Sequence, residues 1–449
     1  MDQLAIIEAS PVARSRPAVW KRPAAWLIDK KLSRGFWIFF AAAFFFDCGF
    51  AVYFFLFNLY LLDFHWNERS IGLVTGALTI GSLIGTLPVG YLAGKVGIRP
   101  MLLVCFVAAP TVGLLRASVL WLPAQMALAF LAGMALCIWG VCFSPAIASL
   151  TTSENRASAF SLIFSVSIGT SALGGLACGY TSRWLVAMGL SIDPTDVKRL
   201  ILQVSCGIAL LGLVPLTVLR FRPANHSGAA VLSSTRQSWS EALRGGSFLV
   251  RFLPSMALWT AVIAAFTPFA NVFLAQRLKF PLAQVGLLFA SSQVCQFVLG
   301  LMTPWLFRRT GLLRGIVLTQ VATAAALLSL AWTSNRMLAA ILFLSFSSIQ
   351  WMSSPGLYNL LMTRVPEEQR SSASAMTMFS NSLLQSIAAV VAGFFLVQFG
   401  YPRVLSGIAG LGAVAALLFQ FVVVPGRGVA KEGVIGVEEV SPGVLSSNT

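Results

Sequence analysis

The chain has 449 residues, of which 57% are hydrophobic and only 10% are charged. Soluble domains carry about one quarter charged residues, so this composition excludes an ordinary soluble protein and predicts one with many membrane spans. The net charge of +16 does not indicate nucleic-acid binding, because the lysines and arginines lie at the ends of apolar runs and form no single basic face.

The first 35 residues (1–35) place basic side chains among prolines and alanines, with no apolar core before a cleavage site, and are predicted to be a retained cytoplasmic tail. Twelve apolar runs then follow, each long enough to cross about 30 Å of hydrocarbon. The first six predict an N-terminal bundle (36–220) and the last six a C-terminal bundle (248–424). A polar cytoplasmic linker (221–247) joins them, and residues 425–449 are predicted to be a disordered cytoplasmic tail. The runs lie at about 36–62, 70–94, 100–119, 122–149, 157–189 and 200–220, and at about 248–275, 282–307, 312–332, 336–362, 371–399 and 403–424.

The distribution of positive charge predicts the orientation of these spans. With the N-terminus in the cytoplasm, the cytoplasmic side receives 22 lysines and arginines and the opposite side nine. Because positive loops stay inside, this asymmetry favours twelve spans with both termini in the cytoplasm. Short loops and the lack of a sorting tail predict an integral protein of the plasma (inner) membrane of a prokaryote.

The residues that usually build cofactor sites are scarce. All seven cysteines lie inside apolar runs, and both histidines lie in or beside predicted loops, so the sequence predicts no zinc site and no disulfide framework. It has no nucleotide-binding loop of Walker type. We therefore expect no metal and no other cofactor. We also expect no enzyme, since the spans offer one acid and no histidine for catalysis.

A repeat with an offset of 214 residues relates the two bundles. The stretch GYLAGKVGIRP (90–100) between the second and third runs predicts a tight cytoplasmic reversal, and PWLFRRTGLLR (304–314) is its second copy. Such halves place a substrate site between them near the bilayer midplane. Further positions match at the same offset, namely Gly72 with Gly286, Leu92 with Leu306, Gly97 with Gly311, Glu154 with Glu368, Arg156 with Arg370 and Gly179 with Gly393.

On these loops and this repeat, the chain resembles the major facilitator superfamily over about residues 36–424. The resemblance implies an all-α membrane protein with twelve transmembrane helices in two pseudo-symmetric six-helix bundles, which transports a solute by alternating access. The loop motif of the family usually has an aspartate where this chain has Gly94. The proton-drug antiporters usually have an arginine where this chain has Ala129, and a proline in the stretch 170–175. Multidrug efflux by proton-drug antiport is therefore kept as an alternative function, and general solute transport is the preferred interpretation.

The resemblance also implies a cytoplasmic gate, in which the basic loops form ion pairs with acids at the ends of the fourth and tenth spans. The alternative is that these charges only orient the spans. The residues assigned to this gate are Gly90, Lys95, Gly97, Arg99, Glu154, Arg156, Arg308, Arg309, Gly311, Arg314, Glu367, Glu368 and Arg370.

Asp47 is the one acid deep inside a predicted span. It follows Phe36 by eleven residues, which places it about 16 Å into the membrane. A carboxylate at this depth costs roughly 2.5 to 3.5 kcal/mol, so it is expected to face a water-filled cavity, pair with a cation or carry a proton. We predict a proton-coupling or substrate-contact site; the alternative is a structural carboxyl bonded to neighbouring helices.

Amide and aromatic side chains supply the other candidates for the cavity wall. An amide in a span also serves as a hydrogen-bond link between helices, so each candidate has a structural alternative. The candidates are Asn58, Trp139, Asn271, Gln293, Gln296, Gln350, Tyr358, Asn381 and Gln385.

This set of side chains predicts the class of ligand. One deep acid with many amides favours an organic cation, a neutral polar solute or a zwitterion. An anion is less favoured, because Arg116 and Arg251 lie near span ends, where they are expected only at a cavity mouth. The sequence thus predicts a monomeric secondary transporter that binds a small-molecule substrate and membrane lipids, with a non-transporting receptor as a second alternative.

Overall fold

The computed structural model describes residues 32–152, 156–187, 193–219, 247–364 and 370–423. Nearly all of the predicted tails and linker lie outside these ranges. Over the described ranges the secondary structure is helical and contains no strand.

The helices follow the predicted runs in order. The first half contains α2 (Arg34–Asp63), α3 (Glu68–Val96), α4 (Ile98–Ser118), α5 (Leu122–Leu150), α6 (Arg156–Ala187), α7 (Pro194–Leu211) and α8 (Leu213–Val218). The second half contains α10 (Ser247–Phe266), η1 (Thr267–Phe269), α11 (Ala270–Val272), η2 (Phe273–Arg277), α12 (Leu282–Thr310), α13 (Leu312–Trp332), α14 (Arg336–Arg364), α15 (Arg370–Leu418) and η4 (Phe419–Val423).

The number of spans agrees closely with the predicted number. In the described ranges, nine helices are long and apolar enough to cross a membrane, or ten if the bent helix α3 counts as one span. Helix α15 is one of the nine, although the non-helical Gly400 divides it into two, and α6 adds a further helix of 32 residues. These segments correspond to the twelve predicted runs, while the full count of twelve spans stays a prediction.

The reversal predicted in each half is confirmed. Gly97 separates α3 from α4 with a φ of 97°, and Gly311 separates α12 from α13 with a φ of 82°. Side chains with a Cβ rarely adopt this region, which explains why glycine stands at both positions. Gly400, with a φ of 73°, turns the chain in the same way in the middle of α15. We call the end with the first two turns the Gly97 end and the other the Gly400 end.

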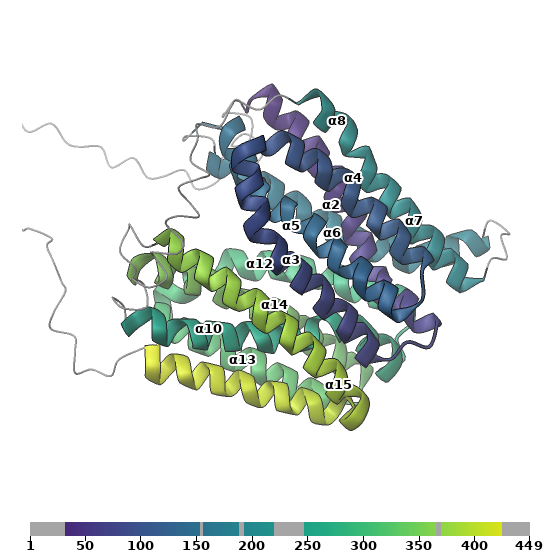
Figure 1. The fold of residues 1–449 in the computed structure, drawn as a ribbon. Helices are drawn as coiled ribbons and strands as arrows, with labels where there is room; N and C mark the ends of the chain where they lie inside the picture. The colour runs from purple at the N-terminus through teal and green to yellow at the C-terminus, as the bar shows by residue number, and fades with distance from the viewer. Residues whose placement is uncertain (1–31, 153–155, 188–192, 220–246, 365–369, 424–449) are drawn as a thin grey trace, which may run out of the picture.

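Figure 1 shows the two halves as separate bundles, with α2 to α8 above and α10 to α15 below. They meet mainly along two helix pairs, α3 with α15 and α6 with α12, with smaller contacts of α2 with α11 and of α3 with η1. Each of the two main pairs contains one helix from each half.

Repeat-related glycines lie at both contacts. A Cβ added to Gly72 of α3 would lie 3.2 Å from the Cα of Gly393 on α15, and one added to Gly286 of α12 would lie 3.4 Å from the Cα of Gly179 on α6. Since 72 pairs with 286 and 179 with 393 in the repeat, the two contacts are equivalent under the pseudo-symmetry. Glycine at all four positions lets the helix backbones approach closely.

Candidate functional site

A cavity of about 400 Å³ lies between the halves. Its wall combines aromatic and aliphatic side chains with amides, hydroxyls and one arginine, as small-molecule sites usually do. It is lined by Ala51, Phe54, Phe55, Phe57 and Asn58 of α2, Val74, Thr75 and Leu78 of α3, Arg116 of α4, Ser171 of α6, Thr267 and Pro268 of η1, Asn271 of α11, and Phe289 and Gln293 of α12.

Two asparagines close the cavity toward the Gly400 end. Asn58 Nδ2 donates to the carbonyl of Pro268 at 2.8 Å, and Asn271 Nδ2 donates to the carbonyl of Phe55 at 2.9 Å. The helix changes to a 3-10 turn at Thr267–Phe269, so its carbonyls are available to partners outside the helix. Both asparagines therefore line the cavity and also link the halves.

Other contacts between the halves gather at the same end. The guanidinium of Arg69 on α3 lies 4.0 Å from the ring centre of Phe394 on α15. The ring centres of Phe55 and Phe289 are 5.3 Å apart. Together with the glycine contacts, these interactions hold the halves together at the Gly400 end.

Asp47 lies one helical turn from the cavity, on the side of the Gly97 end. It is partly buried on α2, and the hydroxyl of Ser167 on α6 donates a hydrogen bond to its carboxylate. Ala51 and Ser171, which line the cavity, are each four residues further along the same helices. Among the described residues the carboxylate has no cationic partner, since the one ion pair there joins Lys198 to Asp63.

Arg116 lines the cavity, although its sequence position predicted a place only at a cavity mouth. It lies near the end of α4, as expected, but its side chain is only 4% exposed and reaches the cavity wall. The guanidinium packs 4.3 Å from the ring centre of Phe57, and Nε donates to Oε1 of Gln125 at 3.4 Å. Its place near the end of α4 agrees with the sequence prediction, but its side chain turns inward and packs on Phe57 of α2. Arg251, by contrast, is exposed.

Of the nine amide and aromatic candidates, three line this cavity: Asn58, Asn271 and Gln293. The other six lie elsewhere. Gln296 donates to Ser347 Oγ at 3.1 Å, and Gln350 donates to the Ser347 carbonyl at 3.2 Å, so both bond within the second half.

The remaining four candidates also lie away from this cavity. Trp139 packs in an aromatic cluster of the first half, with its ring centre 5.2 Å from that of Phe46. Tyr358 and Gln385 are exposed, and Asn381 is partly buried.

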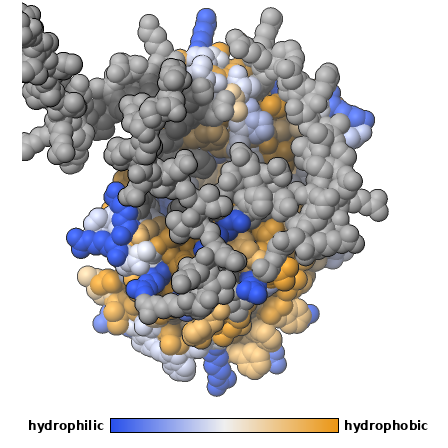
Figure 2. Space-filling model, turned by 90° about the vertical axis from the view of Figure 1, so that its left-hand side faces the viewer, coloured by the Kyte–Doolittle hydropathy of each residue, from blue (hydrophilic) through white to orange (hydrophobic). Residues whose placement is uncertain are grey.

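The predicted gate is described only in part. Lys95 packs over Tyr91 at 4.4 Å, Arg99 donates to the carbonyl of Thr217, and Arg309 packs over Trp305 at 4.6 Å. Figure 2 views the Gly97 end and shows strongly hydrophilic side chains projecting from it.

The acids of the predicted gate, Glu154, Glu367 and Glu368, lie outside the described residues. Arg156 and Arg370 begin the repeat-related helices α6 and α15. Gly90 and Gly311 have no atom within 4 Å of an added Cβ. The ion pairs of the gate therefore stay a prediction.

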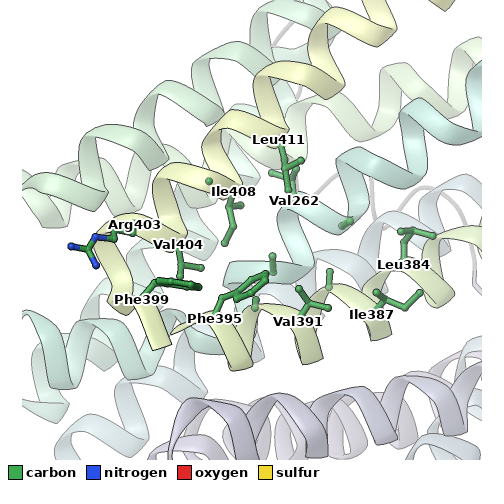
Figure 3. Close-up of a pocket in the computed structure, with 15 residues that line it drawn as sticks. Val262, Leu384, Ile387, Val391, Phe395, Phe399, Arg403, Val404, Ile408 and Leu411 are labelled. Atoms are coloured by element: carbon green, nitrogen blue, oxygen red, sulfur yellow. The ribbon is translucent and has the colours of Figure 1, made fainter. Parts of the chain in front are cut away.

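A larger cavity of about 540 Å³ lies on the second half and does not face the first. It runs between the two parts of α15 and is floored by α10, and Figure 3 shows Val391, Phe395 and Ile408 pointing into it. Its lining is apolar except for the exposed Arg403 at one end. Such a groove suits the acyl chains of lipids better than a polar solute.

Apolar helices arranged in two repeat-related halves around a central cavity define the fold of a secondary transporter. The family model of the Major Facilitator Superfamily matches residues 39–389. The chain belongs to this family and is an integral membrane protein, which confirms the resemblance found in the sequence.

Solved structures agree with this assignment, although no curated protein matches the sequence. The chain is similar to the nucleoside transporter NupG, with 15% identity over 86% of this chain and 98% of that chain and a TM-score of 0.72. It is similar to a D-xylose-proton symporter, with 16% identity over 86% of this chain and 96% of that chain and a TM-score of 0.67. It is also similar to the xylose transporter XylE from E. coli, with 19% identity over 88% of this chain and 97% of that chain and a TM-score of 0.64. At such identities the likeness shows the fold alone.

Proposed function

We propose that this protein is a secondary active transporter, which moves a small organic solute by alternating access through the cavity between its halves. The observation that carries this proposal is the closure of that cavity at one end by contacts between the halves. Asn58, Asn271 and the paired glycines supply these contacts. A state closed at the other end requires these contacts to separate, which is rocking of one half against the other.

The proposal includes coupling to protons through Asp47. Its carboxylate is partly buried, bonds only to a hydroxyl among the described residues and lies one turn from the cavity. A carboxylate with no cation beside it in a membrane is expected to exchange protons with water that enters the cavity. One of the similar structures is that of a D-xylose-proton symporter, which is consistent with this role.

We further propose that the protein acts as a monomer in a prokaryotic inner membrane, with both termini in the cytoplasm. The excess of lysine and arginine at the predicted cytoplasmic ends supports this orientation. The Gly400 end would then face outward, and the structure would represent a state closed to the outside.

The test is solute transport by proteoliposomes that contain the wild type or Asp47→Asn. A panel of sugars, nucleosides, amino acids, carboxylates and amphipathic drugs is offered with and without a proton gradient. We expect Asp47→Asn to keep solute exchange at equal concentrations and to lose accumulation driven by the gradient. The matched control is Asp63→Asn, which removes an acid from the same helix that pairs with Lys198.

Three outcomes decide between the alternatives. Accumulation by Asp47→Asn equal to that of the wild type contradicts proton coupling through this residue. Transport of many unrelated amphipathic drugs favours multidrug efflux. Binding of a solute with no transport of any solute favours a receptor of the same fold.

A further inference from the structure

We propose that the transported solute carries an anionic group, such as a carboxylate or a phosphate, and that Arg116 binds this group. The inference rests on the proposed transport function, because it names the chemistry of the solute that would occupy the cavity. It also reverses the preference for a cation or a neutral solute that the sequence suggests.

Burial without an acidic partner is the first observation. Arg116 is only 4% exposed, its guanidinium packs on the ring of Phe57, and its Nε donates to the side chain of Gln125. The uncharged side chains of Tyr53 and Cys206 also lie near it. The one ion pair of the described residues involves neither Arg116 nor a neighbour in its helix. An arginine is charged at every physiological pH, and a buried charge without a counter-ion is costly. A bound anion would remove this cost.

The geometry of the guanidinium leaves donors for a ligand. Arg116 Nε donates to Oε1 of Gln125 at 3.4 Å, and the amide of Gln125 donates to the carbonyls of Arg116 and Val119. Gln125 thus fixes the guanidinium against the turn between α4 and α5. The Nη groups have no partner among the described residues, and such a fork binds carboxylate and phosphate oxygens in pairs.

Most of the other polar groups of the cavity already donate their hydrogens to partners within the protein. The hydroxyls of Thr75, Ser171 and Thr267 donate to carbonyls of their own helices. The Nδ2 groups of Asn58 and Asn271 donate across the halves.

Free donors therefore remain at Arg116 and Gln293, whose amide makes no hydrogen bond among the described residues. Free acceptors remain at the hydroxyl oxygens and at Oδ1 of Asn58. This arrangement fits a solute with an anionic end and hydroxyl or amine donors elsewhere.

The distance between Asp47 and the guanidinium of Arg116 indicates that the two charged groups have different roles. Phe57, beside the guanidinium, is ten residues beyond Asp47 on α2, which corresponds to about 15 Å along the helix. A small zwitterion is too short to contact both. Arg116 is thus available for the solute while Asp47 exchanges a proton, an arrangement that would couple an anion to proton entry.

The experiment measures binding and transport separately, on the purified full chain. Matched pairs of solutes differ only in charge: a carboxylic acid and its amide, a sugar and its uronate, a nucleoside and its monophosphate. Binding is measured by thermal stabilisation in detergent, and uptake is measured in proteoliposomes. The variants are Arg116→Gln, Arg116→Lys, which keeps the charge, and the control Arg251→Gln, which removes an exposed arginine.

We expect the charged member of at least one pair to bind and to be transported. We expect Arg116→Gln to raise its Kd about 10- to 100-fold, as for the loss of a hydrogen bond to a charged group. Arg116→Lys should lose less affinity for the charged solute, because lysine keeps the positive charge although it lacks the planar fork of donors. Arg251→Gln should match the wild type. Size-exclusion profiles identify any variant that is misfolded. If Arg116→Gln is misfolded, the Kd of Arg116→Lys for the charged solute tests the anion site in its place.

The contrary results are distinguishable from each other. Uptake of only uncharged members, with the same KM in Arg116→Gln and the wild type, overturns the anion site and leaves the transport function standing. Arginine-dependent binding of an anion that is never transported keeps the anion site and contradicts the transport function. No binding of any charged member overturns the anion site, whatever uncharged solute is transported.

Discussion

Asn58 and Asn271 form a reciprocal pair, in which each side chain of one half bonds to a backbone carbonyl of the other. A hydrogen bond within a membrane contributes about 0.6 kcal/mol on average, because alternative partners exist when it breaks. Two such bonds suffice to bias an equilibrium between conformations that differ by a few kcal/mol. In the proposed transport cycle, the pair can therefore hold the halves together at the Gly400 end and still release them.

We predict that Asn271→Ala shifts the protein toward the state open at the Gly400 end. Loss of one bond, at about 0.5 to 1.5 kcal/mol, corresponds to roughly a 2- to 10-fold change in the population ratio. The change is measured by the labelling rate of a cysteine placed at Thr75 in the cavity wall. Gln385→Ala, which removes an exposed amide outside the cavity, is the control and should leave the rate unchanged. Equal rates in all three proteins would contradict the role of the pair.

At the scale of helices, close contact between α6 and α12 depends on glycine. A Cβ at Gly286 would overlap the carbonyl oxygen of Gly175, whereas one at Gly300, further along the same helix, would meet no atom within 4 Å. Backbone at both sides of the contact leaves no flexible side chain to move away. The helices themselves must separate if a larger residue is present.

We predict that Gly286→Ala weakens closure at the Gly400 end and lowers the transport rate, while Gly300→Ala transports as the wild type does. The comparison separates the effect of contact from that of helix propensity, since both changes replace glycine by alanine in α12. Initial uptake rates in proteoliposomes, corrected for protein amount, give the measurement. If both variants transport equally well, the contact tolerates a larger residue and its closeness is not required.

The reversal between α3 and α4 allows a second matched pair of changes. Gly97 has a φ of 97°, so Gly97→Ala introduces backbone strain of about 1 to 3 kcal/mol although the added Cβ meets no atom. Gly90 lies inside α3 with equally open space, and Gly90→Ala should stabilise that helix by up to about 1 kcal/mol. Thermal denaturation in detergent should therefore shift in opposite directions for the two variants. A drop in the midpoint for both would indicate that contacts outside the described residues matter at Gly90.

At the scale of the whole molecule, the proposed transport cycle requires the two halves to move as units. The described contacts between them gather near the Gly400 end, and the packing within each half involves aromatic clusters such as Phe46 with Phe106. A glycine-rich contact between two separately packed halves suits rocking better than local unfolding.

We predict that a cross-link between the halves at the Gly400 end stops transport. Arg69→Cys with Phe394→Cys places two thiols where a guanidinium now packs on a ring at 4.0 Å, and a short bifunctional thiol reagent should join them. The control pair, Lys198→Cys with Asp63→Cys, replaces an ion pair of 2.7 Å that lies at the same end but within the first half. Transport should cease on cross-linking of the first pair and continue for the control. Continued transport by the first pair, with cross-linking verified, would contradict rocking at this contact.

Much of this architecture could be predicted from the sequence, because it depends on local properties of the chain. The order of the spans follows from apolar runs that match the thickness of a bilayer. The reversals at Gly97 and Gly311 and the repeat of 214 residues follow from residues that are adjacent in the chain. The position of Asp47 near the middle of α2 follows from counting along one helix.

Only the tertiary structure decided which polar side chains share a cavity. Gln293 and Gln296 are three residues apart on α12, yet the first lines the cavity and the second bonds to Ser347 within its own half. Arg116 was placed correctly at the end of a span, but its inward direction depends on α2 and α5, which supply Phe57 and Gln125. Sequence position determines how deep a side chain lies in the membrane. The rotation of each helix against its neighbours, set by long-range packing, determines whether that side chain faces lipid, another helix or the solute.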